Sequence, residues 1–484
     1  MTESICVLFA ASEVSPLAST GGLAEVAGSL PQALTMGGFP SSVVMPAYRG
    51  ILDKAPFTNT GLKLSVLMAD EEIAFEVFEG RLSHDVPIYL IKCDPFFDRP
   101  GIYGEGRTDY PDNPERFAFF SRAVIELAER LPKKPDVIVA NDWQTGLIMP
   151  LLLESGPVAP KGLFIIHNQG YLGLAPSTAA SYIGLPDRFY GLEGLEYYGQ
   201  LSYLKAGIVF SQAVITVSPT YAKEIQTPEY GGGLDGVLRL YSGKLHGIIN
   251  GVDYDLWSPS TDPNIASNYD SQNLAGKKIC KQALRQEVGL TGSDDKPLFG
   301  MVSRLTAQKG FTLIVESAAD LFKLGLELVI LGSGEPWFEE QLTALSELYP
   351  NNMRLVIGYD AKFSRRIISG SDFVLVPSLY EPCGLIQLFG LRYGAVPVVR
   401  ACGGLNDTVR DYAGQHPTGL WDNGFKFSQF QSGALVRAVR RACELYVAPG
   451  EWAKMSSSNM LEDFSWAASA KAYAKLIRQV LGAA

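Results

Sequence analysis

The segment Pro297–Leu321, "PLFGMVSRLTAQKGFTLIVESAADL", decides the fold class of this chain. It begins with an apolar run of strand composition, continues through a short loop with Arg304 and Lys309, and ends in an amphipathic helical pattern. A buried strand followed closely by a helix is the repeating unit of a doubly wound α/β domain. Ligands of such domains bind beyond the carboxyl ends of the strands, which is where this loop lies.

The same alternation extends through the rest of the chain. Strand-like runs in the first half are "SICVLFAA", "SSVVMP", "PIYLIKC", "DVIVAND", "GLFIIHN", "AVITVS" and "LHGIIN", and those in the second half are "PLFGMVS", "LELVILGS", "MRLVIGY", "DFVLVPS" and "AVPVVRA". Runs that are apolar throughout and are separated by helices predict parallel sheets covered on both faces.

A chain of 484 residues is too long for one hydrophobic core. The two series of strands are separated by Asn250–Gly276, a segment rich in Asn, Asp, Ser and Pro. We therefore predict one Rossmann-like domain over residues 1–250 and a second over residues 251–458. The last segment, residues 459–484, contains "SWAASAKAYAKLIRQVLGAA", whose composition predicts a helix.

Composition excludes several classes of partner. The net charge is −10 and the pI is about 5.1, which argues against a nucleic acid or an anionic membrane as partner. The N-terminus lacks the basic region of a signal peptide, and no apolar run approaches the roughly 20 residues that span a bilayer. Six scattered cysteines without C-x-x-C spacing and only four histidines predict a cytoplasmic protein without a disulfide framework or metal centre.

Two adjacent glycines, Gly21 and Gly22, stand where the chain passes from its first strand into a helix, in "SPLASTGGLAEV". Bare backbone lets N–H groups approach a phosphate closely, and a helix N-terminus adds positive potential. A tight packing turn is the alternative interpretation, and the local sequence does not separate the two.

The loop after "LFGMVS" carries two cations that predict an anion site. Arg304 can hold a phosphate through two N–H bonds, and Lys309 supplies a point charge. The alternative is a solvated charged loop, which the position at the binding edge of the sheet disfavours.

After the strand "DFVLVPS", Glu381 and Pro382 precede a helix that we expect to open at Cys383 and Gly384. A carboxylate that accepts hydroxyl hydrogen bonds beside helix amides that donate them suits a sugar. Alternatively, Glu381 caps its helix.

A second glycine pair in "ACGGLNDT" follows the next strand, so two adjacent loops could bind one ligand. We interpret Cys383 as a structural thiol, because no histidine lies near it in the sequence.

Two further strand ends of the first half carry polar residues. His167 and Asn168 end the strand of "FIIHNQGY", and Asp142 ends the strand of "ANDWQTGL". A single histidine at a strand end is often structural, but here it lies at the predicted binding edge. Asp142 can bind hydroxyls or cap the helix that follows it.

The motifs "STGGLAEV", "NDWQTGL", "IIHNQGY", "VSPTYAKEI", "GIINGVD", "VSRLTAQKG", "EPCGLIQLFGLRYGAVPVVRACGGLNDTV" and "DFSW" resemble, in this order, the bacterial glycogen synthase and starch synthase family. The resemblance implies the GT-B fold, with two Rossmann-like domains facing a deep cleft and a last helix that crosses back to the first domain. It implies transfer of glucose, with retention, from ADP-glucose to the non-reducing 4-OH of an α-1,4-glucan. It also implies that no metal or other cofactor is needed.

The resemblance also implies roles for individual residues. Arg304 and Lys309 match the pair that binds the donor diphosphate, Glu381 matches the carboxylate facing the donor glucose, and His167 matches the histidine beside its 6-OH. The remaining donor-binding positions are Ser19, Gly21, Gly22, Tyr359, Cys383, Gly384, Leu385 and Ile386. The remaining sugar or acceptor positions are Asp142, Asn168 and Asn250.

The chain departs from the family pattern at four positions. Ser19 stands in place of a lysine, Ile386 in place of a phosphate-contacting threonine, Glu25 in place of an aspartate, and Gln144 in place of a histidine. Losing one charge-assisted contact to the donor costs about 2–4 kcal/mol of transition-state stabilisation. We therefore expect activity with ADP-glucose, with weakened or altered donor use.

Three other functions fit parts of the pattern. One is a related glucosyltransferase with UDP-glucose as donor or a small acceptor, since Tyr359 could stack on either base. Another is a weakly active glucan-binding homologue, whose hallmark would be loss of Arg304, Lys309 or Glu381, all of which are present. The third, phosphorolysis, needs a pyridoxal-phosphate lysine that no motif identifies. Oligomeric state stays open.

Overall fold

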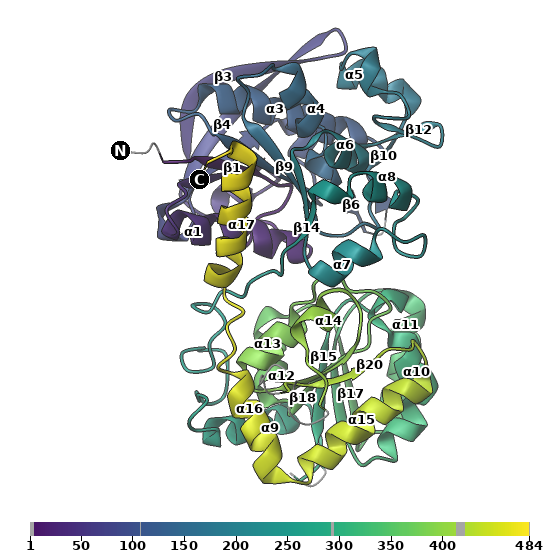
Figure 1. Cartoon of the computed structure of the whole chain (residues 1–484). Helices are drawn as coiled ribbons and strands as arrows, with labels where there is room; N and C mark the ends of the chain where they lie inside the picture. Colours follow the sequence, from purple (N-terminus) through teal and green to yellow (C-terminus); the bar gives the residue numbers. More distant parts are fainter. Residues whose placement is uncertain (1–3, 107, 292–294, 413–421, 484) are drawn as a thin grey trace. The chain divides into compact units, whose positions relative to one another are not determined.

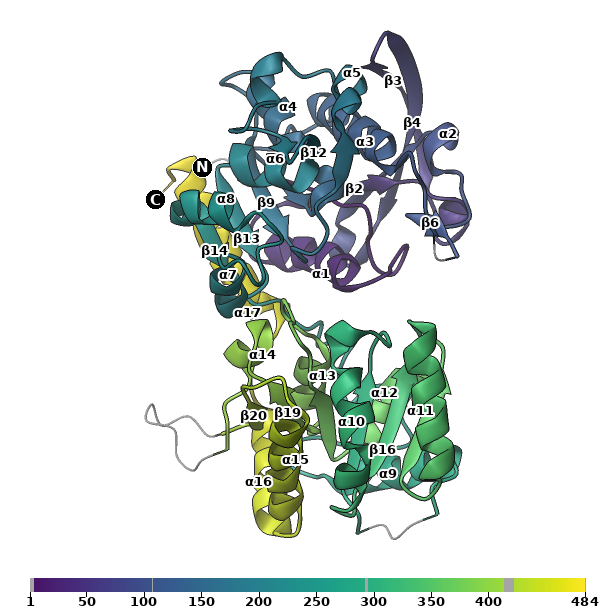
Figure 2. The same cartoon turned by 90° about the vertical axis from the view of Figure 1, so that its right-hand side faces the viewer.

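The computed structural model describes residues 4–106, 108–291, 295–412 and 422–483, shown in two views in Figures 1 and 2. They form two compact units. The first contains the described residues up to Gly251 together with those from Trp466 on, and the second is Val252–Ser465. Each unit has its own sheet, with helices on both faces.

The sheet of the first unit has nine strands in the order β14-β13-β9-β8-β1-β2-β5-β4-β3. All neighbours from β14 to β5 are parallel. Their bounds are β1 Val7–Ala10, β2 Ser41–Pro46, β5 Pro87–Lys92, β8 Val137–Asn141, β9 Lys161–Ile166, β13 Ala213–Thr216 and β14 Leu245–Gly247. Every residue of β1 and β8 is buried, which is why these strands are apolar throughout.

The edge of this sheet differs from the prediction of parallel strands alone. β3 (Thr58–Met68) and β4 (Glu71–Arg81) form an antiparallel hairpin, and β4 also runs antiparallel to β5. Exposed and covered residues tend to alternate along β4, as expected for a strand with one solvated face. The all-parallel prediction is therefore wrong here, because a local hairpin needs no helical crossover.

Helices cover the nine-stranded sheet. They are α1 Gly22–Met36, α2 Asp94–Phe97, α3 Asn113–Arg130, α4 Ile148–Glu154, α5 Ala180–Ile183, α6 Tyr203–Phe210, α7 Pro219–Glu224, α8 Asp235–Leu240 and α17 Trp466–Leu481. Although α17 is last in the sequence, it packs beside α1 (Figure 1). Tyr473 and Ile477 on α17 are fully buried, and Ser469 Oγ donates a hydrogen bond to Ile249 O (2.7 Å). This is the position that the resemblance implies for the last helix.

Two small sheets complete the first unit. One has the order β10-β12-β11, with β10 Leu174–Pro176, β11 Glu196–Tyr197 and β12 Gln200–Ser202. The other pairs β6 (Gly104–Glu105) with β7 (Thr108–Asp109).

The second unit has a six-stranded, fully parallel sheet in the order β17-β16-β15-β18-β19-β20. The strands are β15 Leu298–Val302, β16 Glu327–Gly332, β17 Met353–Ile357, β18 Phe373–Val376, β19 Val396–Arg400 and β20 Phe425–Phe427. The helices are α9 Ala275–Glu287, α10 Phe311–Phe322, α11 Pro336–Leu348, α12 Ala361–Gly370, α13 Ile386–Arg392, α14 Gly403–Thr408, α15 Ser432–Tyr446 and α16 Pro449–Asn459. The doubly wound prediction is confirmed for this unit, and it places the ends of β15 and β18 side by side.

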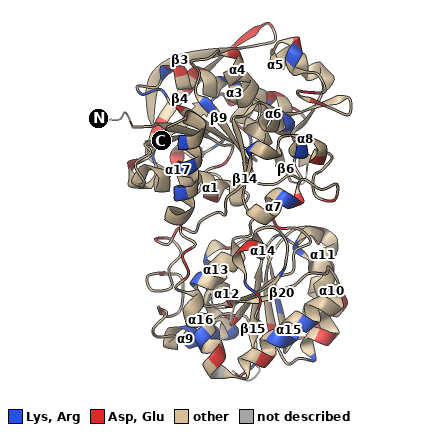
Figure 3. Ribbon diagram, viewed as in Figure 1, with Lys and Arg blue, Asp and Glu red and all other residues tan. Residues whose placement is uncertain are grey.

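Figure 3 shows acidic and basic residues interspersed along the helices of both units. None of the described helices is long and apolar enough to cross a bilayer.

Candidate active site

The loops after β15 and β18 carry an ion pair at the carboxyl edge of the second unit's sheet. Lys309 Nζ donates a hydrogen bond to Glu381 Oε2 (2.6 Å), and Ser378 Oγ donates to the same oxygen (3.0 Å). The Lys309 and Glu381 side chains are 19% and 8% exposed. Parallel neighbours end at the same edge, so two residues that are 72 positions apart meet there.

Backbone contacts fix these two loops against each other. Leu379 N–H donates to Gln308 O (2.8 Å), and Gln308 Nε2 donates to Tyr380 O (3.3 Å). Gly310 has φ +77°, and a Cβ atom there would lie 2.1 Å from Pro377 O. The close approach of the loops therefore requires glycine at position 310.

Arg304 lies at the start of the same loop, directly beyond β15, and is exposed. Within the described part of the chain its guanidinium has no hydrogen-bond or ion-pair partner. Lys309 is neutralised by Glu381 in this structure, whereas Arg304 offers an uncompensated positive charge. A guanidinium in this state can take two oxygens of a phosphate at once.

The turn after Glu381 corrects one expectation. α13 begins at Ile386 and not at Cys383. Gly384 has φ +74°, outside the helical region, and Gln387 Nε2 donates to both Cys383 O (3.0 Å) and Gly384 O (2.9 Å). Residues 382–385 therefore form a separate turn, and the interpretation of Glu381 as a helix cap is wrong, because its carboxylate binds Lys309 and Ser378.

The second glycine pair closes onto this turn. Gly404 N–H donates to Pro382 O (3.1 Å) and Glu381 O (3.2 Å). Gly403 has φ +42°, and a Cβ atom there would lie 1.9 Å from Glu381 O. The loops after β18 and β19 are thus adjacent, as the sequence predicts, and Gly403 is required by their packing.

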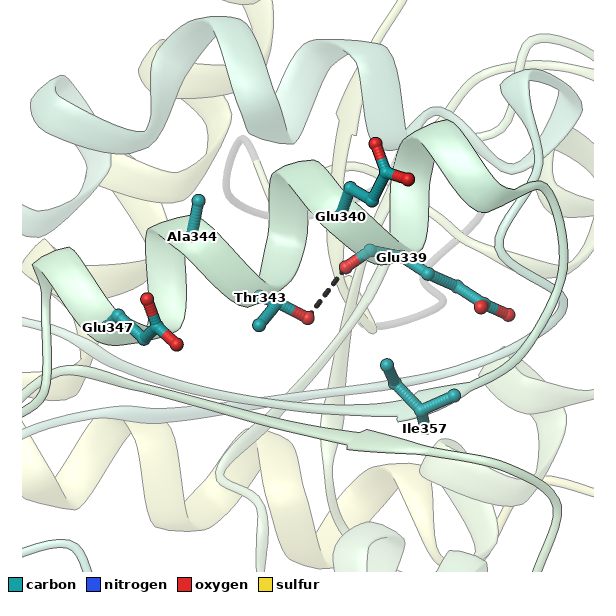
Figure 4. Close-up of a pocket in the computed structure, with 6 residues that line it drawn as sticks. All are labelled: Glu339, Glu340, Thr343, Ala344, Glu347 and Ile357. Atoms are coloured by element: carbon teal, nitrogen blue, oxygen red, sulfur yellow. Dashed lines mark hydrogen bonds between the residues drawn. The ribbon is translucent and has the colours of Figure 1, made fainter.

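Tyr359 follows β17 at the edge of the sheet, two strands away from β15, and its side chain is 85% exposed. A pocket of about 450 Å³ lies nearby on the same unit (Figure 4). It is lined by Glu339, Glu340, Thr343, Ala344, Glu347 and Ile357. None of these is a predicted site residue, and three carboxylates would repel a diphosphate. This pocket is therefore not the donor site.

In the first unit, the ends of β8 and β9 bring Asp142 and His167 together. Asp142 Oδ1 accepts a hydrogen bond from His167 N–H (2.7 Å). His167 Nε2 lies 2.9 Å from Asn141 Oδ1, while Asn141 Nδ2 donates to Ala10 O (3.0 Å). Because Asn141 offers an acceptor, His167 Nε2 carries the proton, and its Nδ1 is left with a lone pair.

Burial sets the charge of both groups. It lowers the pKa of His167 to about 3, so the imidazole is neutral at physiological pH. It raises the pKa of Asp142 to about 7, although hydrogen bonds from the backbone of His167 and Asn168 oppose this. Asp142 also has φ +57°, a conformation that non-glycine residues adopt rarely and that concentrates at functional sites.

Asn168 and Asn250 also lie at strand ends of the first unit. Asn168 Oδ1 accepts from Gly170 N–H (2.9 Å), so this residue shapes the turn after β9. Asn250, beyond β14, is only 4% exposed, and its Oδ1 has no hydrogen-bond partner among the described residues. A buried acceptor without a partner is costly for the protein and is available to a hydroxyl group of a ligand.

The structure separates the two interpretations of Gly21 and Gly22. Apart from the neighbouring residues and the helix backbone itself, no described atom lies within 4 Å of the position that a Cβ would occupy at either residue. Gly21 has φ −175°, which any residue can adopt, and Gly22 starts α1. Packing therefore does not require glycine here, which favours close approach of a ligand over a packing turn. Ser19, two residues earlier, is exposed.

Sequence reasoning missed Glu13, which fixes the loop before Gly21 and Gly22 through hydrogen bonds with Thr20. Its carboxylate is buried and accepts hydrogen bonds from Thr20 N–H, from Thr20 Oγ1 (2.8 Å) and from Tyr103 OH (2.5 Å). The signal was present in the sequence as a lone glutamate two residues after the buried run "VLFAA". Such a residue is buried only if it is well paired.

Comparisons with known proteins agree with this geometry. Residues 6–240 match the starch synthase catalytic domain family, and residues 285–457 match glycosyl transferases group 1. The chain is 42% identical to the glycogen synthases of Syntrophotalea carbinolica and Myxococcus xanthus, in each case over 98% of this chain and 99% of the relative.

Solved structures agree as well. The catalytic domain of starch synthase IV from Arabidopsis thaliana, bound to ADP and acarbose, superimposes with a TM-score of 0.90 and 32% identity over 99% of both chains. A sucrose-phosphate synthase from Thermosynechococcus elongatus, at 16% identity, has a TM-score of 0.62 over 99% of this chain and 100% of that one, and it shows the shared fold alone. The resemblance seen in the sequence is confirmed: the chain belongs to the glycogen synthase and starch synthase family of GT-B glycosyltransferases.

Proposed function

We propose that this chain transfers the glucosyl group of ADP-glucose, with retention of configuration, to the non-reducing 4-OH of an α-1,4-glucan. One observation carries the proposal. In a member of this family, Lys309 and Glu381 meet at the strand edge where the guanidinium of Arg304 has no partner among the described residues. The solved starch synthase was bound to ADP and acarbose, a nucleoside diphosphate and an oligosaccharide analogue.

The leaving group is the first chemical requirement. Breaking the bond between glucose C1 and the phosphate oxygen leaves positive charge on the sugar and negative charge on ADP. Arg304 and Lys309 stabilise that negative charge, which is electrostatic catalysis where charge develops. Lys309 can serve both partners, because its ammonium has three N–H donors and Glu381 uses one of them.

The acceptor is deprotonated without a dedicated enzyme base. In a retaining transfer the acceptor attacks from the face that the diphosphate leaves, so the new bond joins C1 to the acceptor O4 and the hydroxyl proton passes to the leaving phosphate oxygen. His167 is neutral and contributes a hydrogen-bonding group beside the sugar, not a proton donor. Asn250 Oδ1, which is buried and without a partner among the described residues, would accept from a sugar hydroxyl.

Initial rates with ADP-glucose and UDP-glucose on a glycogen primer test the proposal. We expect incorporation from ADP-glucose, and α-linked product by NMR. Absence of transfer from either donor refutes the proposal. A rate that is higher with UDP-glucose supports the second candidate, an altered donor preference, for which the exposed Ser19 at the lysine position is the motivating observation. We place the enzyme in the cytoplasm, since none of its six cysteines, all of which lie in the described part of the chain, forms a disulfide.

A further inference from the structure

A hairpin of the first unit has Tyr198 at its turn, where the backbone conformation is unfavourable for a tyrosine and the side chain is not part of the core. Tyr197 of β11 pairs with Gln200 of β12, so the turn consists of Tyr198 and Gly199 alone. Their φ angles are +46° and +81°, the pattern of a two-residue turn that favours Asn-Gly. Tyr198 is 82% exposed. A bulky residue at positive φ is an outlier, and burial does not explain this one.

The ring is held on a fixed base. Tyr197 OH donates to Gly232 O (2.8 Å), and its ring meets that of Tyr198 edge to face, with centroids 4.9 Å apart at 89°. Lys205, a buried lysine at the foot of the hairpin, donates from Nζ to Glu196 O (2.6 Å) and Leu192 O (2.7 Å). The exposed ring is therefore presented in one place, at low further entropic cost to a ligand.

The hairpin is continuous with the segment that carries His167 and Asn168. Gln169 Nε2 donates to Gly231 O (3.0 Å), and a Cβ at Gly233 would lie 2.4 Å from Tyr197 OH. Residues 231–233 are thus fixed by hydrogen bonds from Gln169 at Gly231 and from Tyr197 at Gly232. On the same small sheet, Leu174 of β10 and nearby Tyr171 are also partly exposed. In Figure 1 this region is found at the labels β10 and β12.

We propose that Tyr198, braced by Tyr197, is a platform that binds an α-glucan chain away from its reacting end. This inference rests on the proposed function, because a polymer that grows at one end must run over the neighbouring protein surface. The apolar C–H face of a glucose ring stacks on an aromatic face, while its hydroxyls bond to exposed amides such as that of Gln200. Tyrosine suits this task, since it gives a large amphipathic surface with few rotatable bonds.

The substitution Y198N distinguishes the effect of Tyr198 on the stability of the turn from its effect on glucan binding. Asparagine is favoured at this φ, so we expect Y198N to unfold at the same temperature as the wild type or higher. It removes the ring, so we expect the dissociation constant for glycogen, measured by native electrophoresis through glycogen-containing gels, to rise about fivefold. Y198F keeps the ring and should bind within about twofold of wild type. The matched control is W337A, since Trp337 is a 51% exposed aromatic residue of the second unit.

Binding in the gel needs no turnover, so its result is separate from that of the donor assay. In the kinetic arm, Y198N should raise KM for glycogen and leave the rate with maltotriose unchanged. The inference is overturned if Y198N binds glycogen as tightly as wild type, or if W337A weakens binding equally. It is also overturned if Tyr198 supports a dimer that Y198N abolishes while glycogen affinity stays the same.

Discussion

Lys309 and Glu381 form a partly buried ion pair, with 2.6 Å between Nζ and Oε2, whereas Arg304 on the same loop has no partner among the described residues. The two cations therefore differ in what they do for the protein itself. We propose that both bind the donor diphosphate, so that Lys309 alone has a structural role as well, through its ion pair with Glu381. This difference can be measured.

Replacing each cation by alanine should give different stability and similar loss of rate. Both R304A and K309A are expected to lower kcat/KM for ADP-glucose about a hundredfold, since each removes one charge from the departing diphosphate. Only K309A should also destabilise the second unit, by about 2 kcal/mol, because Glu381 is left buried without its cation. Initial rates and chemical unfolding test this pair of statements.

The control for that comparison is K323A. Lys323 forms an ion pair with Asp320 in which both side chains are largely exposed. K323A should change neither rate nor stability measurably. Unaltered unfolding of K309A would contradict the structural role of Lys309, and unaltered rates in both variants would contradict the assignment of the diphosphate site.

Asp142 should make stability depend on pH in an unusual direction. Its pKa is raised to about 7 in the folded chain from an ordinary value near 3.8. Between these values the unfolded chain has lost the proton and the folded chain still holds it, so the free energy of unfolding contributed by Asp142 falls as pH rises from about 4 to 7. His167 has the opposite effect. Its pKa is lowered to about 3 in the folded chain from an ordinary value of 6.5, so between these values only the unfolded chain holds the proton, and the free energy of unfolding that His167 contributes rises with pH.

The variant D142N separates the contribution of Asp142 to the pH dependence of stability from that of His167. It keeps the shape of the side chain but cannot titrate, so only the rising contribution of His167 remains below about pH 6.5. The free energy of unfolding of D142N minus that of wild type should increase from pH 4.5 to pH 7. Urea unfolding at four pH values checks this, and a difference that is constant with pH would show that Asp142 titrates normally.

Glu13 should position the glycine loop without touching substrate. In E13Q one carboxylate oxygen becomes an NH2 group, so the side chain can no longer accept both from Thr20 N–H at one oxygen position and from the hydroxyls of Thr20 and Tyr103 at the other. We expect KM for ADP-glucose to rise about tenfold while KM for glycogen changes little, since roughly one hydrogen-bonded anchor of the loop is lost. T20S retains both donors and serves as the matched control. Equal changes in both KM values would indicate a general loss of structure instead.

Restoring the family lysine at the loop gives a gain-of-function test. Ser19 is exposed, and no atom crowds Gly21 or Gly22 beside it, so S19K can be accommodated without repacking. We expect kcat/KM for ADP-glucose to rise about tenfold, because the resemblance implies an ammonium at this position that binds the donor diphosphate. The neutral variant S19Q should show no such gain. If S19K and S19Q behave alike, the loop does not approach the donor phosphates.

By itself, the sequence determined the layers of this protein. Apolar runs alternating with amphipathic ones predict buried parallel strands between helices, because burial on both faces leaves no place for polar side chains in the strand. It also predicts candidate site residues, since Arg304, Lys309, Glu381, Asp142 and His167 all lie beyond the carboxyl ends of such runs, and their roles remain predictions. The hairpin of β3 and β4 escaped this reasoning because its strands are half polar and pair locally.

Only the tertiary structure decided the states of those residues. Lys309 and Glu381 are 72 positions apart, and they meet because β15 and β18 are neighbours in the sheet, an order that no local pattern encodes. The same holds for the raised pKa of Asp142, the neutral ring of His167 and the turn that delays α13 to Ile386. Charge, burial and hydrogen bonding depend on what surrounds a side chain in space, and in this fold those surroundings come from distant parts of the chain.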